Sequence, residues 1–237
     1  MIILAVDSST EACSVALLDS DKLAEDGQPM PPLALYELAP REHSQRLLPM
    51  VDQLLAEAGI SIKQLDAIAF GKGPGSFTGL RICLGLVQGL AYGADVPVIP
   101  VSSLQALAQT ALDLGEVTAG QPVISSIDAR MSEIYWCAYR CEQGLMQPII
   151  DEQLNAPQDF IQPSALDSFA AVGSGWQYRQ AMDYQGLGYC NDQLLPRASA
   201  VATLALAQYQ AGHYCAADQA QPTYIRDQVA WKKIADQ

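Results

Sequence analysis

The chain has 237 residues, 50% of them hydrophobic, which suits one large or two modest folded domains and excludes a disordered chain. Twenty-six acidic residues against thirteen basic ones give a formal charge of −13, which argues against direct nucleic-acid binding, because such binding requires basic residues that neutralise phosphates. No basic segment followed by an apolar core opens the chain, so we expect no signal peptide. Six scattered cysteines favour free thiols in a reducing cytoplasm.

The first elements are strands. Residues 2–6 form a continuous apolar run, and residues 12–18 alternate, so a hairpin with a short, polar, acidic tip is expected. A polar, proline-containing stretch over residues 19–32 predicts an extended loop. A third strand is expected at residues 33–38.

A helix follows this third strand. Apolar residues between positions 47 and 58 recur on one helical face, and Gly59 is placed to end the helix. Ser44 is a candidate for its N-cap. Pro49 must lie in the first turns or kink the helix.

A glycine-rich loop at residues 71–81 is the most distinctive stretch of the chain. An apolar run at residues 65–70 predicts a strand before it, and residues 80–92 predict a helix after it. The spacing of Gly73, Gly75 and the next glycine matches neither the common phosphate loop nor the dinucleotide fingerprint. Two interpretations are about equally favoured, a phosphate site at a helix start and a tight strand-to-helix connection.

The helix after the loop is apolar on all sides, which predicts burial all round. Gly85, Gly89 and Gly93 form a flat stripe along which another backbone could approach closely. Polar interruptions make this run too short to span a bilayer, so no membrane association is expected. The helix is either a central core helix or a core helix that also forms a subunit interface.

A short strand at residues 96–101 comes next, followed by a helix capped by Ser102 or Ser103. A loop at residues 115–122 then marks a boundary. After it the pattern restarts as strand, aspartate, turn and strand. The remaining expected elements are strands at 123–127, 134–139, 145–150 and 169–172, a short helix near 157–161, a glycine turn at 173–176, a helix at 198–212 and an extended, then helical, tail at 222–233.

This repetition suggests two copies of one α/β unit with a cleft between them. Asp7 and Asp128 would face that cleft, where they could hold magnesium through water. Alternatively, each closes its own turn with a local hydrogen bond, or Arg130 neutralises Asp128, and the structural interpretation is favoured. The candidate nucleotide-cleft residues are Asp7, Ser9, Gly73, Gly75, Asp128, Gly173 and Gly175.

No catalytic apparatus is evident in the sequence. No Ser-His-Asp or Cys-His arrangement can be assigned, and no cluster has enough ligands for a metal. His43 is more suited to a cap or an interface contact than to a general base. We therefore expect no catalytic residue, no metal site and no cofactor, with weak ATP or ADP binding left open.

Four segments in combination resemble one known family. They are residues 1–10 (MIILAVDSST), residues 43–49 (HSQRLLP), residues 73–81 (GPGSFTGLR) and the tail from residue 222 to 233 (PTYIRDQVAWKK). Together they resemble the TsaB family, also called YeaZ. The resemblance is close over residues 1–112 and the tail, and loose between them.

The resemblance implies an actin/Hsp70/sugar-kinase-like (ASKHA) α/β fold of two related ribonuclease-H-like lobes. Residues 1–112 would form the N-terminal lobe, to which residues 213–237 would return, and residues 113–212 would form the C-terminal lobe. The implied role is a non-catalytic subunit for making threonylcarbamoyladenosine beside the anticodon of tRNA. Its implied partners are the transferring paralogue TsaD and the ATPase TsaE, with a homodimer when alone and tRNA contacted only through the complex.

Family TsaD proteins carry a His-x-x-x-His metal motif, and the best-matching positions here are Ser103 and Leu107, neither of which can replace a histidine. Pairing in the family uses the helix after His43 and the helix after the glycine loop. The interface residues that the resemblance implies are Leu47, Leu48, Val51, Leu54, Leu55, Arg81, Leu84, Gly85, Gln88 and Gly89. The competing hypotheses are an active ASKHA-type ATPase or phosphotransferase and a peptidase, for which no nucleophile, base or metal is found.

Overall fold

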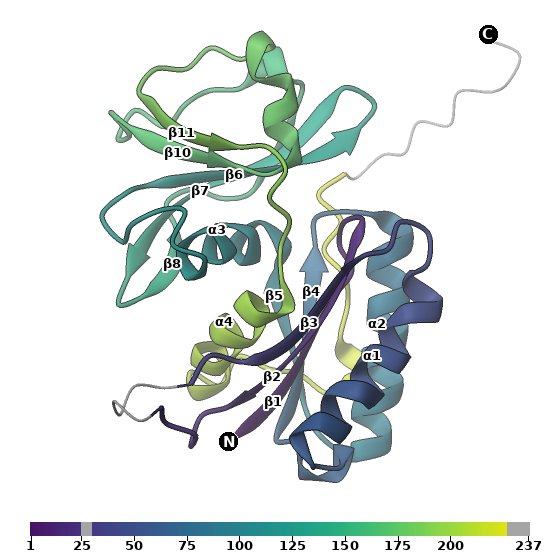
Figure 1. The fold of residues 1–237 in the computed structure, drawn as a ribbon. Coiled ribbons are helices and arrows are strands. Elements are labelled where there is room, and N and C mark those ends of the chain that lie inside the picture. The colour runs from purple at the N-terminus through teal and green to yellow at the C-terminus, as the bar shows by residue number, and fades with distance from the viewer. Residues whose placement is uncertain (25–29, 227–237) are drawn as a thin grey trace, which may run out of the picture.

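The computed structural model describes residues 1–24 and 30–226, which form two lobes, each built around one β-sheet (Figure 1). The first sheet has the strand order β3-β2-β1-β4-β5, with β1–β2–β3 antiparallel and β1–β4–β5 parallel. Its strands are β1 (Ile2–Asp7), β2 (Ala12–Asp19), β3 (Leu33–Leu38), β4 (Ala67–Gly73) and β5 (Val98–Ser102).

The second sheet repeats this arrangement. Its order is β11-β10-β6-β7-β8, with β6–β7–β8 antiparallel and β6–β10–β11 parallel. Its strands are β6 (Val123–Arg130), β7 (Glu133–Glu142), β8 (Leu145–Pro148), β10 (Phe169–Val172) and β11 (Leu187–Asn191), and β9 (Gln153–Asn155) pairs with β7 outside that order. Strand β6 therefore corresponds to β1, and the expected duplication of one α/β unit is confirmed.

Helices α1 (His43–Ala58) and α2 (Phe77–Ala94) cover one face of the first sheet. Except for the exposed Leu48, the predicted stripe of α1 packs in a core shared with β1, β2 and β4, and Gly59, at φ +67°, ends the helix as expected. Ser44 does not cap α1, because the helix already begins at His43 and its N-cap position, Glu42, makes no side-chain capping bond. Pro49 lies inside the helix.

Helices α3 (Ser103–Asp113) and α4 (Ala198–Gln210) lie between the two sheets and contact each other (Figure 1). Ser102 caps α3 by accepting a hydrogen bond from the Gln105 amide at 3.2 Å. Each of the two helices follows the last strand of one sheet but packs mainly on the other sheet. The expected lobes, residues 1–112 and 113–212, assign them the other way round.

Apolar periodicity predicts each helix but not which sheet it covers. Leu104 and Leu107 of α3 join the core of the second sheet, whereas Val201 and Ala202 of α4 join Ile3 in the first. The other elements are short 3-10 helices, η1 (Ile62–Gln64), η2 (Pro157–Asp159), η3 (Ser174–Ala181) and η4 (Ala217–Gln219). The helix expected near residues 157–161 is only the short η2.

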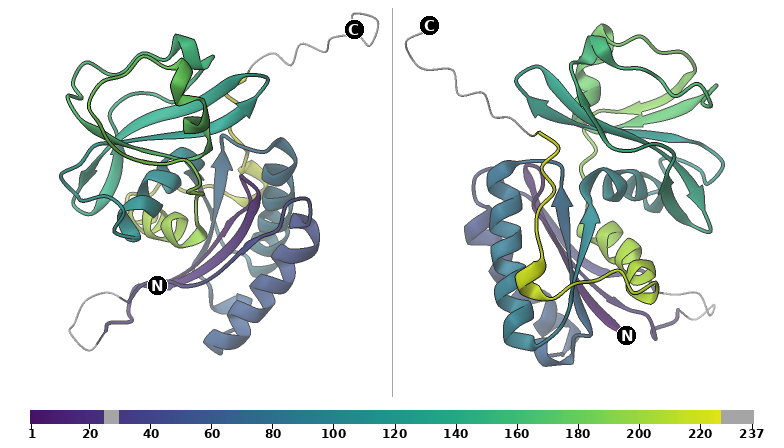
Figure 2. Two further views of the ribbon diagram at one scale, coloured as in Figure 1. Left: turned by 45° about the horizontal axis from the view of Figure 1, so that its top comes forward. Right: turned by 180° about the vertical axis from the view of Figure 1, so that it is seen from behind.

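The segment after α4 returns to the first lobe (Figure 2). Cys215 pairs with Val98 on β5, and Ala220 is buried in the first core. Residues 222–226 are neither helix nor strand, and the predicted helical end of the tail lies outside the described residues. Within the described ranges, no helix is long and apolar enough to cross a membrane.

Candidate functional site

The β1–β2 turn holds the first cleft carboxylate. Asp7 Oδ1 accepts hydrogen bonds from the amide of Ser9 at 3.1 Å and from its hydroxyl at 3.0 Å, so Asp7 closes its own turn. Its other oxygen, Oδ2, is buried without a hydrogen-bond partner among the described residues and points at Gly71, where a Cβ would lie 1.8 Å away. Burial raises the pKa of Asp7 to about 7, although the bonds from Ser9 oppose the rise.

The glycine loop packs directly on this turn. A Cβ on Gly75 would lie 2.3 Å from the carbonyl oxygen of Ser9, and the Ser76 amide donates to that oxygen at 2.7 Å. Gly73, at φ +103°, has the Thr223 carbonyl oxygen 3.0 Å from its Cβ position. The glycines are therefore required by close contacts within the chain, as in a tight strand-to-helix connection.

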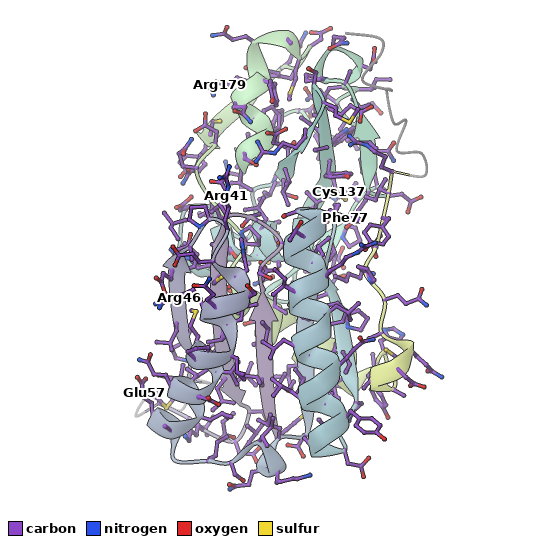
Figure 3. All side chains as sticks on the ribbon, turned by 90° about the vertical axis from the view of Figure 1, so that its right-hand side faces the viewer. Arg41, Arg46, Glu57, Phe77, Cys137 and Arg179 are labelled. Atoms are coloured by element: carbon purple, nitrogen blue, oxygen red, sulfur yellow. The ribbon has the colours of Figure 1, made fainter. Side chains whose placement is uncertain are left out.

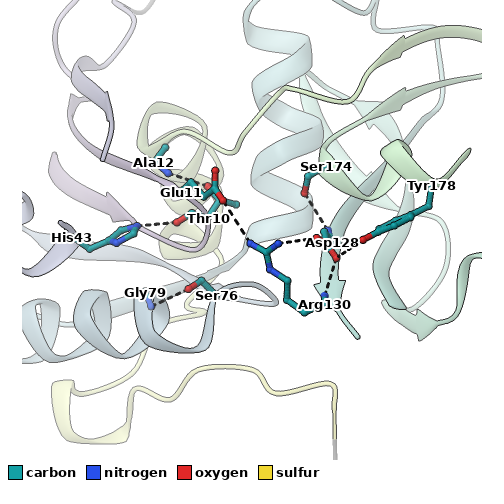
Figure 4. A network of polar contacts seen from close by, with 10 residues as sticks. All are labelled: Thr10, Glu11, Ala12, His43, Ser76, Gly79, Asp128, Arg130, Ser174 and Tyr178. Carbon is teal, nitrogen blue, oxygen red and sulfur yellow. Dashed lines mark hydrogen bonds and ion pairs between the residues drawn. The ribbon is translucent and has the colours of Figure 1, made fainter. Parts of the chain in front are cut away.

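The second lobe carries an equivalent glycine turn. Cβ atoms on Gly173 and Gly175 would lie 2.4 Å from the Ser126 carbonyl oxygen and 1.9 Å from its hydroxyl, respectively. Asp128 Oδ1 accepts from the Arg130 amide at 2.8 Å, and Oδ2 pairs with the Arg130 guanidinium at 3.2 Å (Figure 4). Asp128 thus closes its own turn and is neutralised by Arg130.

Arg130 also reaches the first lobe. Its guanidinium lies 3.6 Å from Glu11 in the β1–β2 turn of the first lobe, so one side chain pairs with a carboxylate on each lobe (Figure 4). Both residues are mostly exposed, at 75% and 68% of their side chains, so the pair is screened by solvent. The candidate cleft residues are brought to the facing edges of the lobes, but each is already bonded or packed within the chain.

In the part of the chain that the structure describes, no group of three or more His, Cys, Asp or Glu residues could hold a metal ion. At the two positions where TsaD would carry histidines, Ser103 accepts a hydrogen bond from the Gly73 amide at 3.1 Å and Leu107 is buried in the core of the second sheet. Both residues stabilise the fold.

The outer face of α2 is open, unlike the packed turns at the facing edges of the lobes. Nothing lies within 4 Å of a Cβ position on Gly85, Gly89 or Gly93, so the glycine stripe is open. Phe77 and Tyr92 are exposed by 53% and 84%. No part of the described chain covers this side, so α2 is not a central core helix buried by its own chain. The alternative, a core helix that also forms a subunit interface, stays a prediction.

The interface residues expected on α1 differ in their exposure. Leu48 is exposed, whereas Leu47, Val51, Leu54 and Leu55 are buried in the first core and cannot reach a partner in this conformation. Figure 3 shows α1 and α2 next to each other on one side of the molecule. The expected residues of α2 lie at its outer side: Arg81, Gly85 and Gly89 are exposed, and Leu84 and Gln88 are half-buried.

Comparison with known proteins decides the family. The tRNA threonylcarbamoyladenosine biosynthesis protein TsaB of Haemophilus influenzae is 41% identical over 243 residues, covering 99% of this chain and 97% of that protein. The chain belongs to the TsaB family. The TsaB of Escherichia coli is 40% identical, covering 99% of this chain and 98% of that protein.

Two further comparisons agree with the TsaB family. Residues 35–234 match the family model for TsaD, tRNA N6-adenosine threonylcarbamoyltransferase. YeaZ from Pseudomonas aeruginosa has a solved structure that superposes with a TM-score of 0.86 at 42% identity, covering 94% of this chain and 99% of that chain. This TsaB-family chain therefore shares the fold of that YeaZ structure, and its two lobes repeat one strand arrangement.

Sequence reasoning missed two features of this TsaB-family chain. His43 neither caps α1 nor faces solvent; its Nε2 donates to the Thr10 carbonyl at 2.8 Å and so fixes the β1–β2 turn (Figure 4). Arg226, near the end of the described chain, bonds to the β6–β7 turn of the second lobe. No local pattern signals either contact, since the partners lie 33 and 97 residues apart in sequence.

Proposed function

We propose that this chain is a non-catalytic cytoplasmic subunit that docks on TsaD through the outer face of α2 and supports threonylcarbamoyl transfer to tRNA. TsaE joins the pair, the protein forms a homodimer when alone, and tRNA is contacted only through the complex. The observation that carries this proposal is the open glycine stripe of Gly85, Gly89 and Gly93 on an otherwise apolar helix.

The stripe suits a helix of a partner protein. Glycines without atoms near their Cβ positions let a second backbone approach more closely than any side chain would allow. Tyr92, next to Gly93 in the chain, and Leu48 of the neighbouring helix α1 supply further exposed apolar surface. A homodimer would bury the same face on both copies, so self-association and docking on TsaD would compete for one surface.

The bonded and packed turns at the facing edges of the lobes support a non-catalytic role. Asp7 and Asp128 are each bonded within their own turns, and the glycine turns pack on Ser9 and Ser126. Any ATP or ADP would have to displace these contacts, so we propose that nucleotide binding is weak and that no cofactor is resident. An ASKHA-type ATPase is therefore the less favoured alternative.

Co-purification with TsaD, scored by restored tRNA modification, tests the proposal. The variant Gly85→Leu fills the open stripe, and Gly120→Leu is a matched control because it adds the same side chain at another open position, in the loop between α3 and β6. We expect the first variant to lose TsaD binding, self-association and modification while its fold is retained. Retained binding by Gly85→Leu, or modification that needs no copy of this chain, would overturn the proposal.

A further inference from the structure

The last described segment, residues 220–226, runs along α2 and ends on the other lobe (Figures 1 and 2). Ala220 is buried in the first core, and its carbonyl accepts a hydrogen bond from Gln88 of α2 at 3.2 Å. The Thr223 amide donates to the Lys72 carbonyl at the end of β4, at 2.7 Å. We call residues 220–226 the strap.

Beside the start of α2 the strap presents an aromatic side chain. The ring of Tyr224 lies 5.7 Å from that of Phe77, and its hydroxyl accepts a hydrogen bond from Arg81 at 3.2 Å. The Arg81 guanidinium in turn lies 3.8 Å from the centre of the Phe77 ring. Tyr224 and Phe77 remain exposed by 44% and 53%, so this cluster extends the open face of α2 at one end.

The strap ends on the second lobe, at the β6–β7 turn. Arg226 forms an ion pair with Glu133 and donates to the Ala129 carbonyl at 3.2 Å. The turn between them is unusual, because Arg130, Met131 and Ser132 all have positive φ, at 61°, 57° and 59°. Non-glycine residues rarely adopt this conformation, so the turn depends on contacts such as those of Arg226.

The same turn carries Arg130, which pairs with Glu11 of the first lobe across the cleft. The turn is therefore contacted by Arg226 of the strap and, through a solvent-screened pair, by Glu11 of the β1–β2 turn. A partner that covers Tyr224 and Phe77 would restrict the strap two residues before Arg226, and that restriction would favour the bonded state of Arg226. Because such coupling is reciprocal, a well-ordered turn would also favour docking.

We infer that the strap couples the docking face of α2 to the β6–β7 turn of the second lobe: Tyr224 forms one end of the docking surface, and Arg226 transmits docking to that turn. This inference rests on the proposed function and adds a residue cluster and a direction of coupling to it. Docking orders the turn.

Hydrogen–deuterium exchange of the full chain, with and without TsaD, tests the coupling. In the natural protein we expect TsaD to slow amide exchange both in α2 and in residues 129–134, by about fivefold in the turn. In Arg226→Gln, exchange in the turn is faster in the free protein, and TsaD slows exchange in α2 but no longer in the turn. Glu133→Gln, which removes the other half of the ion pair, should reproduce this result.

The matched control is Arg140→Gln, which makes the same change on an exposed arginine of β7 that has no ion pair among the described residues. In Arg140→Gln, TsaD should slow amide exchange in α2 and in residues 129–134, as it does in the natural protein. If TsaD protects α2 but leaves exchange in the turn unchanged, or slows it equally in Arg226→Gln, the coupling is wrong and the docking proposal stands. If TsaD protects neither region, docking through α2 is itself wrong and the coupling fails with it.

Discussion

Gly75 and Ser9 are in direct backbone contact, so that a Cβ on Gly75 would lie 2.3 Å from the Ser9 carbonyl oxygen. The Ser76 amide donates to the same oxygen at 2.7 Å, which ties the start of α2 to the β1–β2 turn. This contact explains why a phosphate-like glycine loop occurs in a chain without an evident phosphate-binding role. The loop is glycine-rich because the chain packs backbone on backbone there.

Gly75→Ala should therefore lower the free energy of unfolding by about 1–3 kcal/mol, because the methyl group forces the loop and turn apart. Gly85→Ala is the control: its Cβ meets nothing within 4 Å, and it should raise stability by about 0.5–1 kcal/mol through helix propensity. Urea denaturation of both variants measures the difference. Equal stabilities would show that the loop is not constrained by Ser9.

Asp7 should make the fold less stable as pH rises. Burial raises the pKa of its carboxyl to about 7, so the folded protein retains a proton that the unfolded chain loses near pH 4. The proton bound to Asp7 stabilises the folded protein at low pH, and this stabilisation is lost as the pH rises towards 7. Between pH 5 and pH 8, the natural protein should lose roughly 2–3 kcal/mol more than Asp7→Asn. Denaturation at both pH values tests this, and parallel losses would contradict it.

The isolated protein should show no magnesium-dependent ATP turnover above that of Asp7→Ala. The physical reason is that the Asp128 carboxylate is paired with Arg130 at 3.2 Å, and the Asp7 carboxylate is buried, with Oδ1 bonded to Ser9 and Oδ2 packed against Gly71. A phosphate-release assay with equal amounts of each protein provides the measurement. Robust turnover that disappears in Asp7→Ala would establish the ATPase alternative instead.

Two leucines six positions apart on α1 should separate stability from docking. Leu54 is fully buried, so Leu54→Ala should cost about 2–5 kcal/mol of stability. Leu48 is 45% exposed, so Leu48→Glu should leave stability within about 0.5 kcal/mol but weaken self-association. Thermal unfolding and analytical ultracentrifugation distinguish the two effects. A Leu48→Glu protein that still dimerises with unchanged affinity would remove α1 from the docking surface.

Local sequence patterns determined most of the elements and the repeat. Strict apolar alternation predicts β2, a one-sided stripe with a terminal glycine predicts α1, and the restart after residue 122 predicts the second lobe. These features follow from hydrophobic periodicity and backbone freedom, which depend on neighbours in the chain. The glycine loop and the tail are also local sequence segments, and their resemblance to the TsaB family indicated the family.

Tertiary structure decided what these elements contact. Periodicity could not tell that α3 would cover the second sheet and α4 the first, that Leu54 would be buried while Leu48 stays open, or that Arg226 would cross to the β6–β7 turn. A buried stripe looks the same in sequence whichever sheet covers it, and an ion pair between residues 93 positions apart leaves no local signal. Such choices depend on the packing of whole layers, which only the folded chain fixes.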